Sequence, residues 1–576
     1  MHVAKVEKRQ GDRVYVSYLL RQSYREGDKV KHRTLANLSP LPLPTIELLR
    51  GSLAGQQYLP AGQAFTIQQS WPHGHVAAVL GTAGRMHLER LLDSKPSRQR
   101  DLVLAMIVAR VLQPASKLAT TRLWTATSLA QRLGVEDATA DELYAALDWL
   151  RERQGGIEQR LAKRHLEPGG LVLYDLSSTY MEGEHCPLAK RGYSRDGKPG
   201  QLQIEFGLVT NAEGEPVAIE VFPGNTADPD TFQAQVKKVK ERFGVADVVW
   251  VGDRGMITGA QVRQLQQEAG VSWITALRAP AIQKLVAEGA IQLSLFDTQN
   301  LVEVEDPRYP GERLVVCYNP LLGEKRAKKR EDMLVATEKE LDKVLAMVAR
   351  GAEGGRAGLR GAAQIGERVG RVVNKYAMAK HFRRTITDSS FSYERDEASM
   401  SAEAALDGLY VLRTNLAKER LTSAAVVLAY KSLEQVEDAF HHFKLTDLEV
   451  RPVFHYLEER VRAHVLLCML AYSVQRTMER ALAPLLFKDE AIPHRDDPVA
   501  PAPRSAAARR KDLTKLTADG FPVHSFRTLL AQLGSLVKNR VIPHGADSAA
   551  SFDMATQPSL LQARAFELLG LDVKAL

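Results

Sequence analysis

Three acidic residues of this sequence have settings that would allow shared chemistry. The apolar runs LVLYD and VVWVGD are typical of buried strands, and each ends on an aspartate, Asp175 and Asp253. Either aspartate alone is more simply explained as a turn or helix-cap residue, because Asp favours both positions. The third, Glu437, lies in the helical pattern YKSLEQVEDAFHHFK, which follows a further strand-like run. The two aspartates would lie at strand ends of one sheet, and the glutamate on a helix that follows the next strand. We therefore expect the three carboxylates to converge.

The Glu437 helix is strongly amphipathic. Considered alone, its polar face is an ordinary solvated surface. The polar positions, three or four residues apart, are Tyr430, Glu434, Glu437, His441 and Lys444, and the apolar positions opposite are Leu433, Val436, Phe440 and Phe443.

Converging carboxylates predict a metal site. Three negative charges at one point repel one another unless cations lie between them, and hard oxygen ligands suit Mg²⁺ or Mn²⁺. Two such ions, about 3.5 to 4 Å apart, stabilise the attacking and leaving oxygens of an in-line phosphoryl displacement. The residues themselves therefore indicate a metal-dependent enzyme that cuts or joins nucleic acid backbones.

The elements around the carboxylates predict a mixed five-stranded sheet flanked by helices, in an α/β (α+β multidomain) protein. Helical patterns cover residues 228–243 and 258–269. Strand patterns cover residues 171–174, 204–209, 217–222, 248–251 and 273–277. We expect the catalytic core in residues 169–280 and 406–485.

The rest of the chain falls into four further segments. We expect a β-rich N-terminal unit, a helical domain that binds end DNA, an insertion domain rich in charge, and a Pro, Ala and Arg-rich linker followed by a small helical C-terminal unit. Their ranges are 1–95, 96–168, 281–405 and 486–576.

Composition excludes several classes of protein. The 576 residues are 45% hydrophobic, which is ample for packed cores, and 77 Lys and Arg against 69 Asp and Glu give a net charge of +8 that favours a polyanionic partner. The 3 cysteines are widely separated and form no disulfide framework. No apolar run approaches the ~20 residues that span a bilayer, and the N-terminus lacks a signal-peptide pattern. We expect no membrane partner and a cytoplasmic, nucleoid-associated protein.

Several motifs taken together resemble the DDE transposases of bacterial insertion sequences, in the branch with a Tyr, Arg, Glu, Lys signature. The resemblance extends from about residue 171 to residue 475. The motifs are YDLSSTY, GYSRDGKPGQLQIEFGLV, the GEP turn, FPGNTADPDTF, VGDRGMIT and YKSLEQVEDAFHHFK. The resemblance implies an RNase H-like core interrupted by a long insertion, with Asp175, Asp253 and Glu437 as catalytic residues that hold two Mg²⁺ (or Mn²⁺) ions.

The resemblance also implies phosphate contacts. Tyr430 and Lys444 take the Tyr and Lys places of the signature, but the Arg place is Leu433, so another residue must supply that contact. A tryptophan that stacks a flipped base in hairpin-forming relatives is replaced by Glu434, which leaves the hairpin step open. Trp273 reads as a core residue.

Two clusters of basic residues can each be interpreted in two ways. Arg191, Arg195 and Lys198 flank a Gly-rich turn that is either a phosphate-facing loop or a surface hairpin. The KRAKKR run is either a DNA contact or a solvated helix face. Its basic residues are Lys325, Arg326, Lys328, Lys329 and Arg330.

We expect an insertion-sequence transposase that cleaves double-stranded DNA at terminal inverted repeats and transfers the strands into target DNA. Because two ends must be cut together, we expect a homodimer on paired ends. The alternatives are a catalytically silent DNA-binding descendant, against which the three intact carboxylates argue, and another RNase H-like nuclease without strand transfer. The absence of G-x-x-x-x-G-K-[ST] and G-x-G-x-x-G motifs gives no support for a nucleotide cofactor.

Overall fold

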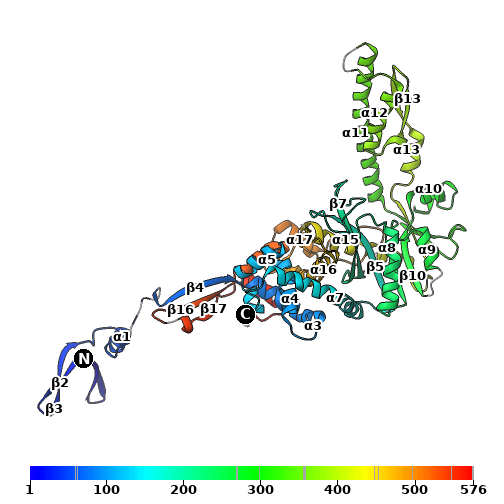
Figure 1. Ribbon diagram of the computed structural model, residues 1–576. Helices are drawn as coiled ribbons and strands as arrows, with labels where there is room; N and C mark the ends of the chain where they lie inside the picture. The colour runs from blue at the N-terminus through cyan, green and yellow to red at the C-terminus, as the bar shows by residue number, and fades with distance from the viewer. Residues whose placement is uncertain are drawn as a thin grey trace. The chain divides into compact units, whose positions relative to one another are not determined.

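The computed structural model describes residues 1–573 except 57, 59, 61–62, 267–269, 297–298, 355–357, 447, 452, 496 and 547, with only the backbone of 293, 295, 445 and 446. The chain divides into two units, one formed by Met1–Pro72 with Leu536–Gln557 and the other by His73–Ser535 with the residues from Pro558 onward. The two units are described separately (Figure 1).

The first unit contains two antiparallel three-stranded sheets. In one sheet the strands follow chain order, and α1 packs against β1 through Ile46 and Val3. In the other, β16 pairs with β4 and β17. The elements are β1 (His2–Gln10), β2 (Arg13–Glu26), β3 (Lys29–Asn37), α1 (Leu43–Leu53), β4 (Phe65–Pro72), β16 (Val537–Pro543) and β17 (Phe552–Ala555).

The expected helical C-terminal unit differs from the structure at β16 and β17. β16 pairs with β17 and also with β4, more than 400 positions earlier in the chain, and local sequence pattern cannot reveal so distant a pairing. Helices do occur nearby, at α17 (Ala506–Thr514), α18 (Phe526–Gly534) and α19 (Leu560–Leu568).

The second unit begins with helices, and the first two of them lie within residues 1–95, which the sequence pattern assigns to a β-rich unit. A capping box at Thr139 and Glu142 starts the long helix α7, and Ser97 caps α4. Both pack against α16, in which 16 of the 24 residues are buried. The helices are α2 (Gly74–Arg85), α3 (Leu88–Leu92), α4 (Arg98–Leu112), α5 (Lys117–Leu123), α6 (Leu129–Leu133), α7 (Ala140–His165) and α16 (Glu458–Ala481).

The described residues of the second unit form a nine-stranded sheet. Five of its strands have the order β8-β7-β5-β9-β10, with antiparallel pairs among the first three and parallel pairs from β5 to β10. These are the five strands that the sequence predicts. Their bounds are β5 (Leu171–Tyr180), β7 (Leu202–Asn211), β8 (Pro216–Pro223), β9 (Val248–Val251) and β10 (Val271–Ala276).

Four more strands make the sheet larger than predicted. β15 pairs with β10, β12 with β15, and β11 with β12, while the short β6 joins β7. β11 and β12 come from residues that the sequence pattern assigns to the insertion, where charged residues interrupt short apolar runs. The bounds are β6 (Lys190–Arg191), β11 (Leu301–Val304), β12 (Arg313–Tyr318) and β15 (Leu409–Thr414).

Several helices pack on the sheet or follow its strands in the sequence. Helix α8 continues into the π-helical turn η3, and α9 covers part of the predicted 258–269 helix, whose last three residues lie outside the described residues. The side chain of Trp273 is fully buried in the core, as predicted. The elements are α8 (Asp228–Lys237), η3 (Lys238–Arg242), α9 (Gly259–Leu265), α10 (Ala279–Ala287), α14 (Ser423–Lys431), α15 (Glu434–His441) and the π-helical turn η6 (His442–Thr446).

Between β12 and β15 the chain builds a separate hydrophobic core. Leu341 and Val344 of the long helix α11 pack with Val369 of α12 and with Phe382 and Phe391 of a β-hairpin. Figure 1 shows these elements side by side. They are α11 (Pro320–Ala352), α12 (Ala362–Lys375), β13 (Phe382–Ile386), β14 (Phe391–Arg395) and α13 (Glu397–Ala404).

In the described part of the chain, no single helix is both long and apolar enough to cross a membrane. One bent pair of helical segments, Arg98–Leu112 with Lys117–Ala126, passes this test on length and composition, with a bend of 85°.

Candidate active site

The two aspartates lie at the same level on neighbouring parallel strands. Leu173 of β5 is level with Val251 of β9, so Asp175 and Asp253 both follow that pair by two residues. Adjacent strands are about 4.8 Å apart, which brings the two backbones close. Asp253 follows the end of β9, as predicted. Asp175 does not end its strand, because pairing with β7 continues β5 to Tyr180.

Backbone groups orient the Asp253 carboxylate. Its Oδ1 accepts hydrogen bonds from the amides of Gly255 and Met256, at 2.9 and 2.7 Å. The Thr275 hydroxyl donates to the Asp253 carbonyl at 3.0 Å. The turn that starts VGDRGM therefore fixes one carboxylate oxygen and the backbone of the residue that carries it.

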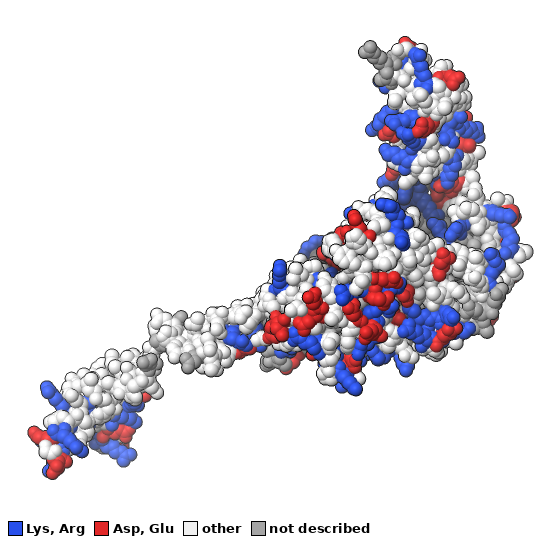
Figure 2. Space-filling view, in the orientation of Figure 1, with Lys and Arg blue, Asp and Glu red and all other residues white. Residues whose placement is uncertain are grey.

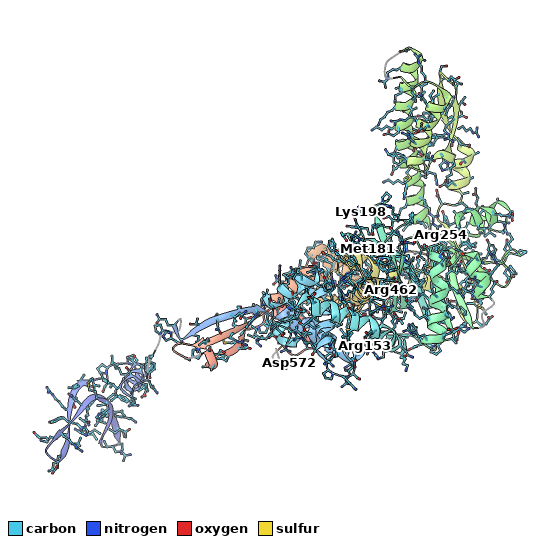
Figure 3. All side chains as sticks on the ribbon, in the orientation of Figure 1. Arg153, Met181, Lys198, Arg254, Arg462 and Asp572 are labelled. Carbon is cyan, nitrogen blue, oxygen red and sulfur yellow. The ribbon has the colours of Figure 1, made fainter. Side chains whose placement is uncertain are left out.

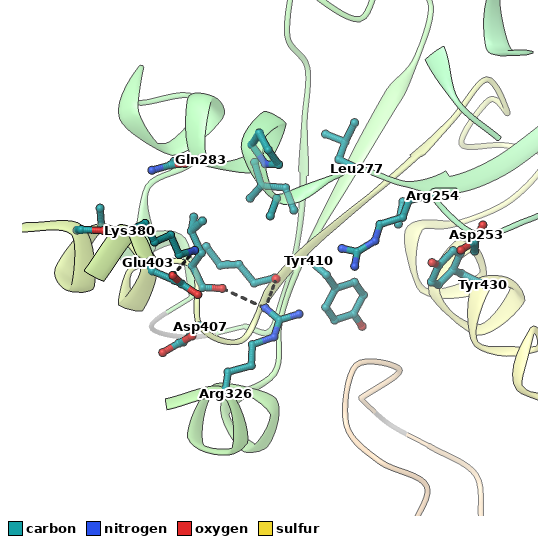
Figure 4. A pocket seen from close by; sticks show the side chains of 18 of the residues that line it. Asp253, Arg254, Leu277, Gln283, Arg326, Lys380, Glu403, Asp407, Tyr410 and Tyr430 are labelled. Carbon is teal, nitrogen blue, oxygen red and sulfur yellow. Dashed lines mark hydrogen bonds and ion pairs between the residues drawn. The ribbon is translucent and has the colours of Figure 1, made fainter. Parts of the chain in front are cut away.

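Glu437 reaches the same region from α15. Its side chain is exposed and lines a cavity of about 810 Å³ together with Asp253 and Tyr430. Figure 4 shows Asp253 and Tyr430 close together at one end of this cavity. The cavity is therefore bounded on one side by two of the predicted catalytic residues.

Electrostatic repulsion acts among the three carboxylates. Burial, together with the negative charges of Asp253 and Glu437, raises the pKa of Asp175 to about 7. Burial also raises the pKa of Glu437, with further contributions from Glu434, Asp438 and Asp253. A divalent cation would relieve this repulsion, and carboxylate oxygens are suitable ligands for it.

The oxygen atoms of the three carboxylates are suitable ligands for a hard divalent cation, but in this structure the three side chains do not converge on one point. Within the described residues, no group of three His, Cys, Asp or Glu side chains is close enough to hold a metal ion. Side-chain rotation, above all of the exposed Glu437, would have to accompany binding.

The predicted single helix around Glu437 is two helices. Helix α14 ends at Lys431, α15 begins at Glu434, and Lys444 lies in the π-helical turn η6. Tyr430 and Glu437 therefore belong to different helices, although both line the cavity. The break consists of Ser432 and Leu433. Leu433 is 7% exposed and packs in the core, so an arginine at this position would be buried away from the cavity.

Lys444 is held in an ion pair. Its Nζ lies 3.1 Å from Asp196 Oδ1, and its side chain is only 9% exposed. Burial lowers the pKa of Lys444. Lys444 thus connects η6 to the Gly-rich turn that contains Asp196.

The three basic residues of that turn have different environments. Arg195 makes ion pairs with Glu205 and Asp228. Lys198 is exposed, with its Nζ 4.1 Å from the centre of the Tyr180 ring. Arg191 is exposed and donates to a backbone carbonyl. Arg191 and Lys198 are therefore accessible at the surface, whereas Arg195 is engaged by carboxylates.

The KRAKKR cluster lies on the first turns of α11. Lys325, Lys328 and Lys329 are exposed, and Arg330 is paired with Asp407 at 3.0 Å. Arg326 donates to the carbonyls of Leu406 and Leu409, at 3.3 and 3.1 Å, and lines the cavity. Only Arg326 of this cluster therefore joins the candidate site.

Two further cations line the cavity and were not singled out from the sequence. Arg254 is exposed and lies near the base of α11 (Figure 3). Its position directly after Asp253, inside the VGDRGMIT motif, could have identified Arg254 as a candidate site residue from the sequence. Lys380 comes from the insertion and makes an ion pair with Glu403. No pattern in the sequence connects it with the carboxylates.

The strand order β8-β7-β5-β9-β10, with Asp175 on β5 and Asp253 just after the parallel strand β9, defines an RNase H-like catalytic fold. The family model described as the transposase DDE domain matches residues 172–474, and the model described as the IS1634 family transposase N-terminal domain matches residues 3–62. The chain belongs to the DDE transposases of insertion sequences and is an enzyme of that family. A general dependence on divalent metal follows from that membership.

Two solved structures are similar to the chain. A piggyBac transposase synaptic complex with hairpin DNA is 10% identical, with 80% of this chain and 76% of that chain covered and a TM-score of 0.33. The Mos1 transposase paired-end complex with left transposon end is 14% identical, with 33% and 62% covered and a TM-score of 0.13. No curated protein matches the chain.

Proposed function

We propose that Asp175, Asp253 and Glu437 are the catalytic carboxylates of this transposase and together hold two Mg²⁺ or Mn²⁺ ions. The observation that carries the proposal is the equal level of Asp175 and Asp253 on adjacent parallel strands, with Glu437 and Asp253 lining one cavity. Bound divalent ions would supply a nucleophilic hydroxyl and neutralise charge on the reacting phosphate.

The protein's own contribution is binding and orientation. The Gly255 and Met256 amides hold the Asp253 carboxylate in one direction before any ligand arrives. The β5–β9 pairing keeps Asp175 beside it. Preorganisation of this kind lowers the cost of assembling charged groups around a phosphate.

Cations around the cavity supply the contacts to the DNA backbone. Arg254 takes the place of the missing signature arginine, because it is exposed in the cavity that Tyr430 and Glu437 also line. Tyr430 and Arg326 add contacts on either side. Lys325, Lys328 and Lys329, with Arg191 and Lys198, extend the positive surface beyond the cavity. Lys444 acts by fixing the Gly-rich turn through Asp196.

The substrates in this proposal are the element's terminal inverted repeats and a target duplex, cleaved and joined by a homodimer on paired ends. The two ends of an element must be cut together, and a homodimer provides one active site for each end.

The test compares Glu437→Gln with Glu434→Gln on DNA carrying the element's own ends, with Mg²⁺. Both glutamates are exposed on α15, but only Glu437 lines the cavity. Joined products that vanish in Glu437→Gln and persist in Glu434→Gln support the proposal. End binding without cleavage by the wild type favours the silent descendant, and cleavage without joining favours an RNase H-like nuclease.

A further inference from the structure

The N-terminal sheet carries most of the net positive charge of the chain. Residues 1–37 contain nine Lys and Arg against four Asp and Glu, a net charge of +5, compared with +8 for all 576 residues. Figure 2 shows Lys and Arg side chains at the surface of this part. The sheet is small, and most residues of its three strands are exposed.

Strand register assigns each side chain to one of two faces. Val3 and Leu20 face each other across β1 and β2 and pack with Ile46, which defines the face covered by α1. Alternation places His2 and His32 on the opposite face, and their rings are in contact at 5.6 Å. We call this opposite face the open face. Its polar residues are His2, Lys8, Gln10, Arg13, Tyr15, Ser17, Arg21, Ser23, Arg25, His32, Thr34 and Asn37.

Acidic residues are absent from the strands of the open face, all of which are described. Glu7 and Glu26 lie on the face covered by α1, where Lys5 pairs with Glu7 at 2.7 Å and Lys31 pairs with Glu26. Asp12 and Asp28 lie in the turns between strands. The cations of the α1 face are thus partly neutralised, whereas those of the open face are not.

We propose that the open face binds duplex DNA, with Lys8, Arg13, Arg21 and Arg25 contacting phosphates. Three strands span about 10 Å from first to last backbone, comparable with the ~12 Å width of the major groove. Between the cations lie amide and hydroxyl side chains, at Gln10, Ser17, Ser23 and Thr34, which can bond to base edges. This inference rests on the proposed function and assigns the element's end as the duplex.

The experiment uses the full chain and two fourfold variants that each remove four positive charges. The open-face variant is K8Q/R13Q/R21Q/R25Q, and the matched control on the α1 face is K5Q/R9Q/K29Q/R33Q. Dissociation constants for an end duplex are measured at several salt concentrations. For the open-face variant we expect a Kd at least tenfold higher than that of the wild type near 0.1 M salt. The slope of log K against log salt concentration should become shallower by about 0.9 for each lost phosphate contact. The control variant should lose much less.

Equal losses in the two variants, or a wild-type Kd and slope in the open-face variant, would overturn the inference. If wild type binds and cuts the ends in either of those cases, the proposed function stands and only this surface is wrong. A wild type that neither binds nor cuts the ends overturns both. Unchanged circular dichroism and melting temperature establish that the variants fold. If the fourfold variant fails to fold, Arg21→Gln with Arg33→Gln as its control gives the same comparison through the salt slope.

Discussion

Asp175 has the most unfavourable charge environment of the three carboxylates. It lies inside a paired strand, where burial and two neighbouring carboxylates disfavour its ionised form and raise its pKa to about 7. A residue placed for stability alone would not combine these features, since each of them costs free energy. The proposed metal ions would turn this cost into a favourable interaction.

Asp175→Asn should therefore have opposite effects with and without metal. In EDTA the variant should melt at a higher temperature than wild type, by the equivalent of about 1 kcal/mol, because it removes a repelled charge. Added Mg²⁺ should stabilise wild type and leave the variant nearly unchanged. Thermal melts with and without Mg²⁺ measure this, and Asp230→Asn, at an exposed position of α8, is the control. Equal stabilisation of the variant and wild type by Mg²⁺ would remove Asp175 from the metal site.

Lys117 is buried where α5 meets α16. Its Nζ lies 3.4 Å from His464 Nδ1, and burial lowers the pKa of Lys117 to about 7. Because the unfolded value is 10.5, the unfolded chain binds more protons between about pH 7 and 10.5, and stability should rise with pH in that window.

Lys117→Met should raise the free energy of unfolding at pH 7, by at most about 5 kcal/mol, and flatten its rise up to pH 10. Urea unfolding at pH 7 and pH 9.5 measures both effects. Lys328→Met, at an exposed position, should change neither. A Lys117→Met variant that is less stable at pH 7 and keeps the wild-type pH slope contradicts the expectation.

Residue types and short motifs were sufficient to predict that Asp175 and Asp253 lie in one sheet, because each follows an apolar run that forms a central strand. They could not show that Lys444 is engaged by Asp196, which lies 248 positions away. They also could not show that Leu433 packs in the core, since helical periodicity predicts one unbroken helix where the chain makes two. Local pattern specifies elements, whereas partners distant in sequence specify what each side chain can reach.

At the scale of elements, two glycines let the Gly-rich turn and the FPGNTADPDTF loop approach each other. A Cβ on Gly192 would lie 1.9 Å from the Gly224 carbonyl oxygen, and a Cβ on Gly224 would lie 2.0 Å from the Gln203 carbonyl oxygen. Gln203 Nε2 also donates to the Gly224 carbonyl at 2.8 Å. This close contact positions the segments that carry Arg195 and Asp228.

Gly224→Ala should destabilise the protein by about 1 to 3 kcal/mol, because the atoms it would meet belong to the backbone and cannot rotate away. Gly370→Ala is the matched control. It lies within α12 with no atom within 4 Å of an added Cβ, and should stabilise by up to about 1 kcal/mol through helix propensity. Denaturant midpoints compare the two. A Gly224→Ala variant as stable as wild type would show that the two loops can separate without cost.

At the scale of the whole molecule, the insertion leaves and re-enters the large sheet at one point. Tyr318 of β12 and Leu409 of β15 are paired, and the Asn319 amide donates to the Gly408 carbonyl at 2.9 Å. The segment between them has its own hydrophobic core. The sequence indicated an insertion from the length and charge of this stretch, but its point of attachment depends on pairing between β12 and β15.

Deleting residues 320–407 joins Asn319 directly to Gly408 between the paired residues Tyr318 and Leu409. Asn-Gly is the preferred sequence of a two-residue β-hairpin turn, and Gly408 already has a φ of 81°. We expect the shortened protein to fold, with cooperative melting within about 5 °C of wild type. It should not cleave end DNA, because the cavity loses the wall that carries Arg326 and Lys380.

The variant K325Q/K328Q/K329Q removes three positive charges of the insertion but keeps the side of the cavity that the insertion forms. It should keep the fold and the cavity, and weaken end binding most at low salt, because only phosphate contacts are removed. Melting, end binding and cleavage are measured on both proteins. A shortened protein that aggregates would show that the insertion stabilises the core. One that folds and still cleaves would place all essential contacts on the RNase H-like sheet and α15, and would leave the insertion a role only in target or partner binding.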